Sequence, residues 1–153
     1  EETYDPTARM TRGQFSAMLV RALDLHAEKE QQFQDAKTSS FAQELQALVE
    51  IGALKGDGNQ LKPNATITRN QAALMIERLF THLELDLPEV SGEELNFTDI
   101  EKIPESSKKS VALMQQLGIF TGKDDGRFDP NGKLTRSQMS KVIYKALTYA
   151  EMM

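Results

Sequence analysis

The stretch Thr11-Arg12-Gly13-Gln14 opens an amphipathic run, and its pattern returns as Thr68-Arg69-Asn70-Gln71 and Thr135-Arg136-Ser137-Gln138. Thr followed three residues later by Gln is the capping-box pattern, in which each side chain bonds the backbone N–H of the other and a helix begins. Behind each box, apolar residues recur at i, i+3, i+4, i+7 and i+8, on one helical face. Three equivalent long helices are predicted, with apolar positions Phe15, Met18, Leu19, Ala22, Leu23; Ala72, Met75, Ile76, Leu79, Phe80; and Met139, Val142, Ile143, Ala146, Leu147.

Each box places an Arg at the first helical position: Arg12, Arg69 and Arg136. Free N–H groups and the helix dipole make this position positive, so a cation there is disfavoured by roughly 0.3–1 kcal/mol. The repeated choice indicates a negative group nearby, because a helix N-terminus with a guanidinium is a good site for a carboxylate or phosphate. The alternative is that each Arg pairs with an Asp or Glu of the same fold.

The composition is that of a globular protein of about one domain, since 39% of the 153 residues are hydrophobic and 27% charged. A formal charge of −5 argues against sequence-independent binding of nucleic acid. No apolar run approaches the roughly 18 residues of a membrane-spanning helix, so we expect no membrane insertion. The absence of cysteine excludes disulfides and thiolate chemistry.

The repeated unit extends upstream of the box, and a Pro lies six residues before each Arg, at positions 6, 63 and 130. Pro fixes an extended approach and removes a donor, which suits a tight turn into the helix. The steps between boxes are long, which is typical of an array of structural units.

The second and third units also have an earlier half, which opens with Phe-x-Asp at Phe33–Asp35 and Phe97–Asp99. Short helices are predicted over residues 41–51 and 107–117, each ended by a glycine in the left-handed conformation. A short apolar turn follows each stop and closes at Gly56 or Gly122. Residues 1–25 hold only the later half of the first unit, and residues 33–84 and 97–150 form the second and third. We therefore expect a chain cut from a longer protein or processed at its N-terminus.

Taken together, these motifs resemble the S-layer homology family over almost the whole of residues 1–153. The third unit carries the match in order: Phe97-Thr98-Asp99, Gly118-Ile119-Phe120-Thr121-Gly122, Phe128-Asp129-Pro130 and Leu134-Thr135-Arg136-Ser137-Gln138. The resemblance implies an all-α, pseudo-threefold, three-prong spindle with a central three-helix bundle and short helices in the prongs. It also implies a non-catalytic module without cofactor, located outside the cell in the bacterial cell wall or S-layer.

The implied partner is a secondary cell-wall polysaccharide of the pyruvylated N-acetylmannosamine type, bound in grooves between prongs. By the resemblance, Arg12, Arg69 and Arg136 contact its carboxylate. The resemblance gives the opening acids Asp35 and Asp99 the role of accepting from sugar hydroxyls or orienting an Arg. The set of implied ligand-binding residues is completed by Phe41, Gly56 and Gly122, the glycines allowing close approach of a sugar ring.

Several alternatives remain open at the level of sequence. The acids also suit caps of the short helices, and the glycines also suit the turn alone. The family commonly has a Trp early in the short helix, where this chain has Phe41 and Ser107. The alternative function is a protein-interaction or S-layer assembly module, with residues 83–97 as a docking segment and another surface-layer protein as partner. The sequence predicts no catalytic and no metal site, and the acidic stretch at residues 123–129 is interpreted as a turn.

Overall fold

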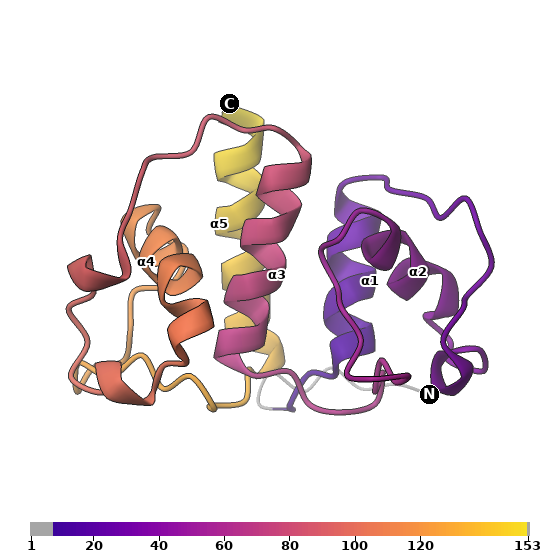
Figure 1. Ribbon diagram of the computed structural model, residues 1–153, viewed down its shortest axis with the longest axis horizontal. Coiled ribbons are helices and arrows are strands. Elements are labelled where there is room, and N and C mark those ends of the chain that lie inside the picture. Colours follow the sequence, from indigo (N-terminus) through magenta and orange to yellow (C-terminus); the bar gives the residue numbers. More distant parts are fainter. Residues whose placement is uncertain (1–7, 153) are drawn as a thin grey trace.

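The computed structural model describes residues 8–152, and that part of the chain is helical, with no strand beyond isolated bridges between single residues. The α-helices are α1 (Arg12–Ala22), α2 (Ala42–Glu50), α3 (Arg69–His82), α4 (Lys108–Gln116) and α5 (Arg136–Met152). Short 3-10 turns occupy Gln34–Ala36, Gly92–Glu94, Ile100–Lys102 and Glu105–Ser107. The predicted all-α class is confirmed (Figure 1).

The predicted capping boxes start all three long helices. In α1, Gln14 N–H donates to Thr11 Oγ1 at 3.1 Å, and Thr11 N–H donates to Gln14 Oε1 at 2.9 Å. The same reciprocal pair opens α3 and α5. The helix starts are therefore fixed locally, by the boxes that the sequence displays.

A closed ring of backbone hydrogen bonds joins the three residues that precede the Thr caps. Met10 N–H donates to Leu134 O at 2.9 Å, Ile67 N–H to Met10 O at 2.9 Å, and Leu134 N–H to Ile67 O at 3.3 Å. All three side chains are buried in the core. Because the cycle closes, the base of the molecule has a pseudo-threefold arrangement, from which α1, α3 and α5 rise in the same direction (Figure 1).

The first amides of each long helix bond to the proline turn of the next unit. Arg12 N–H donates to Ala65 O, Arg69 N–H to Gly132 O and Arg136 N–H to Ala8 O, each at 2.9 Å. In α1 and α3 the second amide also donates, to Pro63 O and Pro130 O at 3.0 Å. These amides therefore already have acceptors, which corrects the expectation of a helix terminus with free N–H groups.

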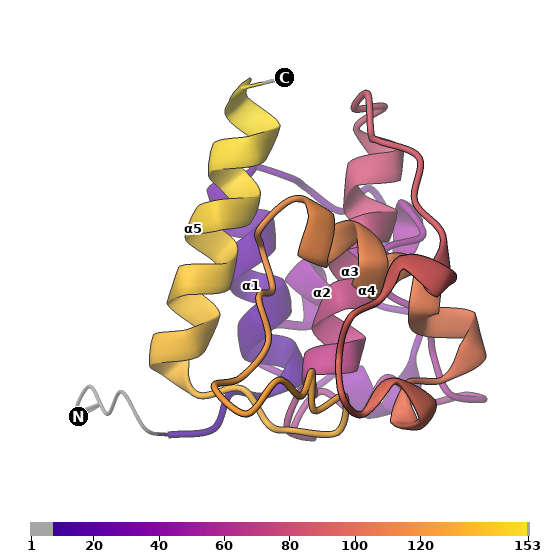
Figure 2. The ribbon, with the colours of Figure 1, turned by 90° about the vertical axis from the view of Figure 1, so that its left-hand side faces the viewer.

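The short helices pack on the long helix of the preceding unit, α2 on α1 and α4 on α3. Each is followed by a glycine with positive φ, Gly52 at 80° and Gly118 at 75°, as the sequence predicts. Residues 8–152 thus contain two pairs of a short and a long helix, and the three-prong spindle that the family resemblance implies stays a prediction. In the view of Figure 2, α5 forms one edge of the molecule.

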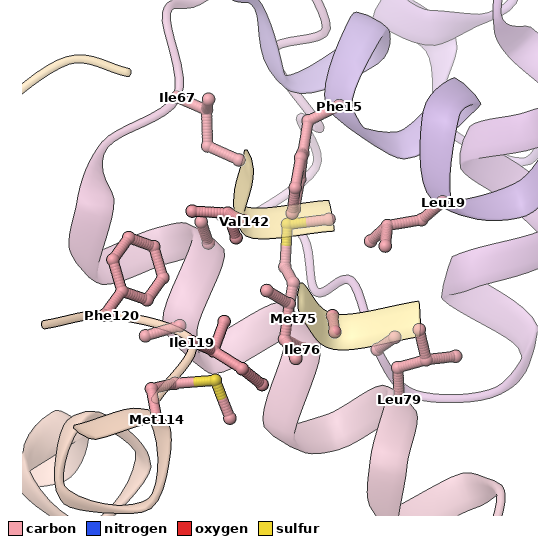
Figure 3. Close-up of a cluster of buried hydrophobic side chains, with 14 of the residues drawn as sticks. Phe15, Leu19, Ile67, Met75, Ile76, Leu79, Met114, Ile119, Phe120 and Val142 are labelled. Carbon is pink, nitrogen blue, oxygen red and sulfur yellow. The ribbon is translucent and has the colours of Figure 1, made fainter. Parts of the chain in front are cut away.

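The core lies between the long helices and the inner faces of the short ones. Figure 3 shows Phe15 and Leu19 of α1, Met75, Ile76 and Leu79 of α3, and Val142 of α5 converging with Met114, Ile119 and Phe120 of the third unit. Most predicted apolar positions are buried. The exceptions include Ala22, which is exposed because α1 ends there.

The linker between the second and third units packs on this same core. Leu85, Leu87 and Val90 are half-buried against it, and Tyr149 Oη donates to Asp86 O at 3.3 Å. The apolar side chains that suggested a docking segment therefore contact their own fold. Within residues 8–152, no helix combines the length and the apolar character needed to cross a membrane.

Candidate anion-binding site

Arg69, the first residue of α3, has its guanidinium over two aromatic rings of the third unit, which contact each other edge to face. Its Cζ lies 5.0 Å from the ring centroid of Phe120 and 5.1 Å from that of Phe128. Its Nε donates to Phe128 O at 2.6 Å, and the residue is only 8% exposed. No carboxylate of the described residues lies within ion-pair distance of it. Stacking of this kind is worth about 0.5–2 kcal/mol, so the cation is held without being neutralised.

The electrostatic state of Arg69 follows from its burial. Desolvation lowers the pKa of the guanidinium, and the more distant carboxylates of Asp129 and Asp99 act in the opposite direction. Because Arg is so basic, it remains protonated. A cation removed from water attracts an anion more strongly than an exposed one, since less solvent screens it.

The opening acid of the third unit anchors the loop that carries this site. Both carboxylate oxygens of Asp99 accept backbone N–H groups, from Phe128 and Asp129, each at 2.8 Å. Asp99 is 6% exposed, so these bonds are largely shielded from water. Asp99 positions Phe128, whose ring and carbonyl both contact Arg69. It does not form an ion pair with Arg69, and its contact with a sugar stays a prediction.

The glycine that closes the turn leaves room for the aromatic residue of Phe-x-Asp. A Cβ on Gly122 would lie 2.7 Å from the Phe97 ring, and one on Gly56 would lie 2.5 Å from the Phe33 ring. Gly122 also has a φ of 88°, in the left-handed region. The ring of Phe97 in turn packs on Phe128, with centroids 5.3 Å apart. These glycines therefore serve packing within the fold, and close approach of a sugar stays a prediction.

Substitution of Gly122 by Ala is expected to destabilise the protein more than the same change at Gly118. Both glycines have positive φ, which costs an Ala about 1 kcal/mol, but the space beside Gly118 is open. At Gly122 the buried Phe97 must also move, for a further 1–3 kcal/mol, roughly. Urea denaturation of the two variants measures the difference. Equal losses of unfolding free energy would contradict the tight contact with Phe97.

A cavity of about 620 Å³ opens beside Arg69. One wall is the turn of residues 119–125 in the third unit, and the other is α5, through Gln138, Lys141, Val142 and Lys145. Gly122 lies in the first wall. The predicted residues Arg69 and Gly122 thus meet at one cavity, whereas Lys141 and Lys145 of α5 were not among the predicted site residues.

The charges around this cavity are unevenly paired. Lys123 Nζ lies 2.6 Å from Asp129 Oδ2, and Arg127 Nε lies 2.7 Å from Asp125 Oδ2, so these two cations are neutralised. Arg69, Lys141 and Lys145 have no ion-pair partner among the described residues. The unpaired negative charge in the lining is the exposed carboxylate of Asp124. The lining therefore favours an anionic ligand over a cationic one.

Arg12 occupies the equivalent position in α1, but fewer contacts hold its guanidinium in place. Its Nη2 approaches Lys55 O at 3.4 Å, and its Nε is buried with no hydrogen-bond partner. Burial lowers the pKa of Arg12, opposed by Asp57 and Asp35. Where Arg69 has two aromatic rings, the corresponding residues beside Arg12 are Leu54 and Leu61, so the second unit lacks the stacked support.

Asp35, the opening acid of the second unit, repeats the anchoring role of Asp99. Its oxygens accept from Leu61 N–H at 3.1 Å and Lys62 N–H at 2.9 Å. Desolvation raises the pKa of Asp35, but these backbone bonds more than offset it, so the pKa is lowered. Arg12 and Asp35 therefore affect each other's pKa through their charges, but they do not form an ion pair.

Phe41 and Ser107, the residues directly before α2 and α4, contact the preceding long helix. Phe41 packs on Gly13, where a Cβ would lie 3.0 Å from the ring, and the Arg21 guanidinium lies 5.7 Å from its centroid. Ser107 Oγ accepts from Asn70 Nδ2 at 3.0 Å. The packing of the large Phe41 on the small Gly13 is therefore replaced, at the equivalent positions, by the hydrogen bond between Ser107 and Asn70. Stacking of Phe41 on a sugar stays a prediction.

Arg136, the third predicted arginine, starts α5 and is half-buried. Its backbone N–H is bonded to Ala8 O. The first unit's proline turn begins in residues 1–7, which lie outside the described part of the chain, so Arg136 as a ligand contact stays a prediction.

The acidic stretch at residues 123–129 folds as a turn, as predicted. Gly126 N–H donates to Lys123 O at 2.9 Å and Lys123 N–H to Arg127 O at 2.8 Å. Across residues 8–152, no group of three or more His, Cys, Asp or Glu side chains is placed to hold a metal ion.

Sequence comparison places these features in a known family. The S-layer homology domain matches residues 32–73 and 96–140, which include the boxes of Arg69 and Arg136. The chain is 38% identical over 145 residues to an endoglucanase of Bacillus sp. (strain KSM-635), covering 92% of this chain and 15% of that protein. It is 31% identical over 146 residues to an amylopullulanase of Thermoanaerobacterium thermosulfurigenes, covering 94% and 8%.

An S-layer protein of Bacillus thuringiensis subsp. finitimus is 26% identical over 145 residues, covering 93% of this chain and 17% of that protein. The chain thus spans less than a fifth of each of these relatives. The family match covers more than half of this chain, and its two segments end within α3 and α5. The chain therefore belongs to the S-layer homology domain family, and it is a module of the cell surface, associated with the cell wall.

Proposed function

We propose that this chain is a non-catalytic anchoring module that binds an anionic secondary cell-wall polysaccharide through Arg69 and, more weakly, Arg12. The observation that carries the proposal is the state of Arg69. It is almost fully buried, lies over the faces of two adjoining rings and is directed by Phe128 O, yet no carboxylate of the described residues neutralises it. Burial of a charge without a partner is costly, so a bound anion stabilises this arrangement.

The ligand that suits this site carries a carboxylate on a sugar. A guanidinium binds a carboxylate with planar, charge-assisted hydrogen bonds, which fix the orientation of the group as well as its charge. The adjoining cavity of about 620 Å³ is within the usual size of a small-molecule site. A pyruvate ketal on N-acetylmannosamine combines both elements, an acid and a compact sugar ring.

The relatives support attachment as the shared role. Two of them are named for glycan-degrading activities and one is an S-layer protein, yet each contains a segment like this chain as a minor part of its length. A segment common to proteins with such different names fits an anchor better than a catalytic centre. The larger protein that this chain serves is attached through it to the cell wall.

The proposal is tested by calorimetric titration of the protein with purified pyruvylated secondary cell-wall polymer. The control ligand is the same polymer after mild acid removal of the ketal, so that chain length and sugar composition are matched. We expect removal of pyruvate to weaken binding at least about tenfold, because a charge-assisted contact is worth about 1.5–3 kcal/mol. Equal affinity for both polymers would contradict recognition of the acid.

The competing function is assembly with another surface-layer protein on the same fold. It predicts no heat of binding with either polymer and a larger particle in sedimentation when a surface-layer protein is added. The anchoring proposal predicts the opposite for the pyruvylated polymer. The two functions are therefore separated by the same purified protein.

A further inference from the structure

We propose that the cavity beside Arg69 has a second anion subsite, formed by Lys141 and Lys145 of α5, so that its ligand carries two acidic groups. The inference rests on the proposed function, because it assumes that the first acid binds at Arg69. It adds a specificity that the arginine repeat alone does not give, since a single guanidinium needs only one acid.

The geometry of α5 brings the two lysines to one wall. Lys141 and Lys145 are four residues apart and therefore lie on the same helical face, about 6 Å apart along the axis. Both line the same cavity as Arg69. A ligand that reaches from Arg69 along this wall passes both ammonium groups.

The charge balance indicates what these lysines bind. Like charges at this spacing repel each other on a helix. Neither lysine has an ion-pair partner among residues 8–152, although the neighbouring Lys123 and Arg127 each have one. The cavity thus combines a buried guanidinium and two unpaired ammonium groups with one unpaired acid, Asp124, because the other two lining charges, Lys123 and Asp125, are paired with residues outside the lining. A second acid on the ligand relieves the repulsion that the protein leaves uncompensated.

The other units show that this wall is particular to α5. The residues equivalent to Lys141 and Lys145 are Leu74 and Arg78 in α3, and Ala17 and Arg21 in α1. Arg21 is paired with Glu44 at 2.9 Å. Of the three long helices, α5 therefore carries the adjacent pair of cations. The sites of Arg12 and Arg69 are accordingly unequal, and the second acid is recognised at Arg69.

The chemistry of the subsite suits a carboxylate or a phosphate, because an ammonium group binds either as a point charge. The ligand is therefore an acidic oligosaccharide whose terminal acid contacts Arg69 and whose second acid lies on a following sugar. A carboxylate on that sugar and a phosphodiester between sugars are distinguished by the probes of the experiment.

The test is calorimetric titration with three probes: pyruvylated N-acetylmannosamine methyl glycoside, a disaccharide with a second pyruvyl group, and a disaccharide with a phosphate in its place. The variant is Lys141→Gln with Lys145→Gln, since Gln and Lys have similar helix propensity. The control, Lys29→Gln with Lys102→Gln, removes the same charge from exposed residues outside the cavity lining. We expect the α5 variant to lose roughly fivefold to tenfold in affinity for one of the doubly acidic probes.

The same variant is expected to bind the singly acidic probe within about twofold of the parent protein, because Arg69 is unchanged. The probe that loses affinity identifies the second acid as carboxylate or phosphate. The subsite is overturned if no doubly acidic probe binds better than the singly acidic one, or if the α5 variant loses no more than the control. Binding of the singly acidic probe with no such preference overturns the subsite alone, whereas no binding of any probe also overturns the proposed function.

Discussion

Replacement of Arg69 by glutamine is expected to weaken binding of the pyruvylated polymer by about 10- to 100-fold, because a hydrogen-bonded charge contact contributes about 1.5–3 kcal/mol. Glutamine keeps a polar side chain but loses the charge and the planar fork. It also loses the cation–π contacts with Phe120 and Phe128 that orient the guanidinium. The measurement is calorimetric titration at fixed ionic strength.

The matched control is Arg21→Gln, which removes the same charge from an exposed arginine paired with Glu44. It is expected to bind as the parent protein does. Arg69→Lys provides a second variant, which keeps the charge without the planar, bidentate geometry and should fall between the two. A loss in Arg21→Gln as large as that in Arg69→Gln would show that only the net charge matters.

Replacement of Asp99 by alanine is expected to lower the free energy of unfolding by about 2–5 kcal/mol. The change leaves the N–H groups of Phe128 and Asp129 without their acceptor, and each buried unsatisfied group costs about 1–3 kcal/mol. It also releases the loop on which Arg69 is stacked. Urea denaturation followed by far-ultraviolet circular dichroism measures the loss.

Two further variants show how large the loss of unfolding free energy in Asp99→Ala is by comparison. Asp124→Ala removes an exposed acid near the same cavity and is expected to change stability by less than about 0.5 kcal/mol. Asp35→Ala removes the equivalent anchor in the second unit, where the carboxylate is half-exposed and water can replace part of its bonding, so its effect should be intermediate. If Asp99→Ala proved as mild as Asp124→Ala, the anchoring role of Asp99 would be refuted.

Local signals in the sequence predicted the helices well. The boxes at Thr11, Thr68 and Thr135 fixed the starts of α1, α3 and α5, because the bonds that begin a helix lie within four residues. The stops at Gly52 and Gly118 were likewise predicted, since a left-handed residue there is a local requirement.

The backbone hydrogen bonds that join one unit to another could not be predicted in the same way. Periodicity identifies which face of a helix is buried, but it does not say which backbone carbonyl accepts the first amide of that helix. The ring through Met10, Ile67 and Leu134 is therefore new information from the structure. The first amides of α1 and α3 are not free for a ligand because they donate separately, to Ala65 O and Gly132 O of the next unit's proline turn.

The candidate site was predicted in part. Arg69 was identified from its unfavourable position at a helix start, and the structure places it at a cavity. Asp99 was expected to face a sugar or an Arg, whereas its oxygens accept backbone N–H groups, which no sequence pattern reveals. Lys141 and Lys145 were missed, although a position-by-position comparison with Leu74 and Arg78 would have shown that α5 carries both ammonium groups.

The most direct test of the central claim is a crystal structure of the protein with pyruvylated N-acetylmannosamine methyl glycoside. The claim is that the guanidinium of Arg69 is the anchor of the acid. We predict the ketal carboxylate within hydrogen-bond distance of the terminal nitrogens of Arg69, with the sugar in the adjoining cavity. A sugar bound elsewhere, with Arg69 contacting only groups of its own chain, would contradict the account.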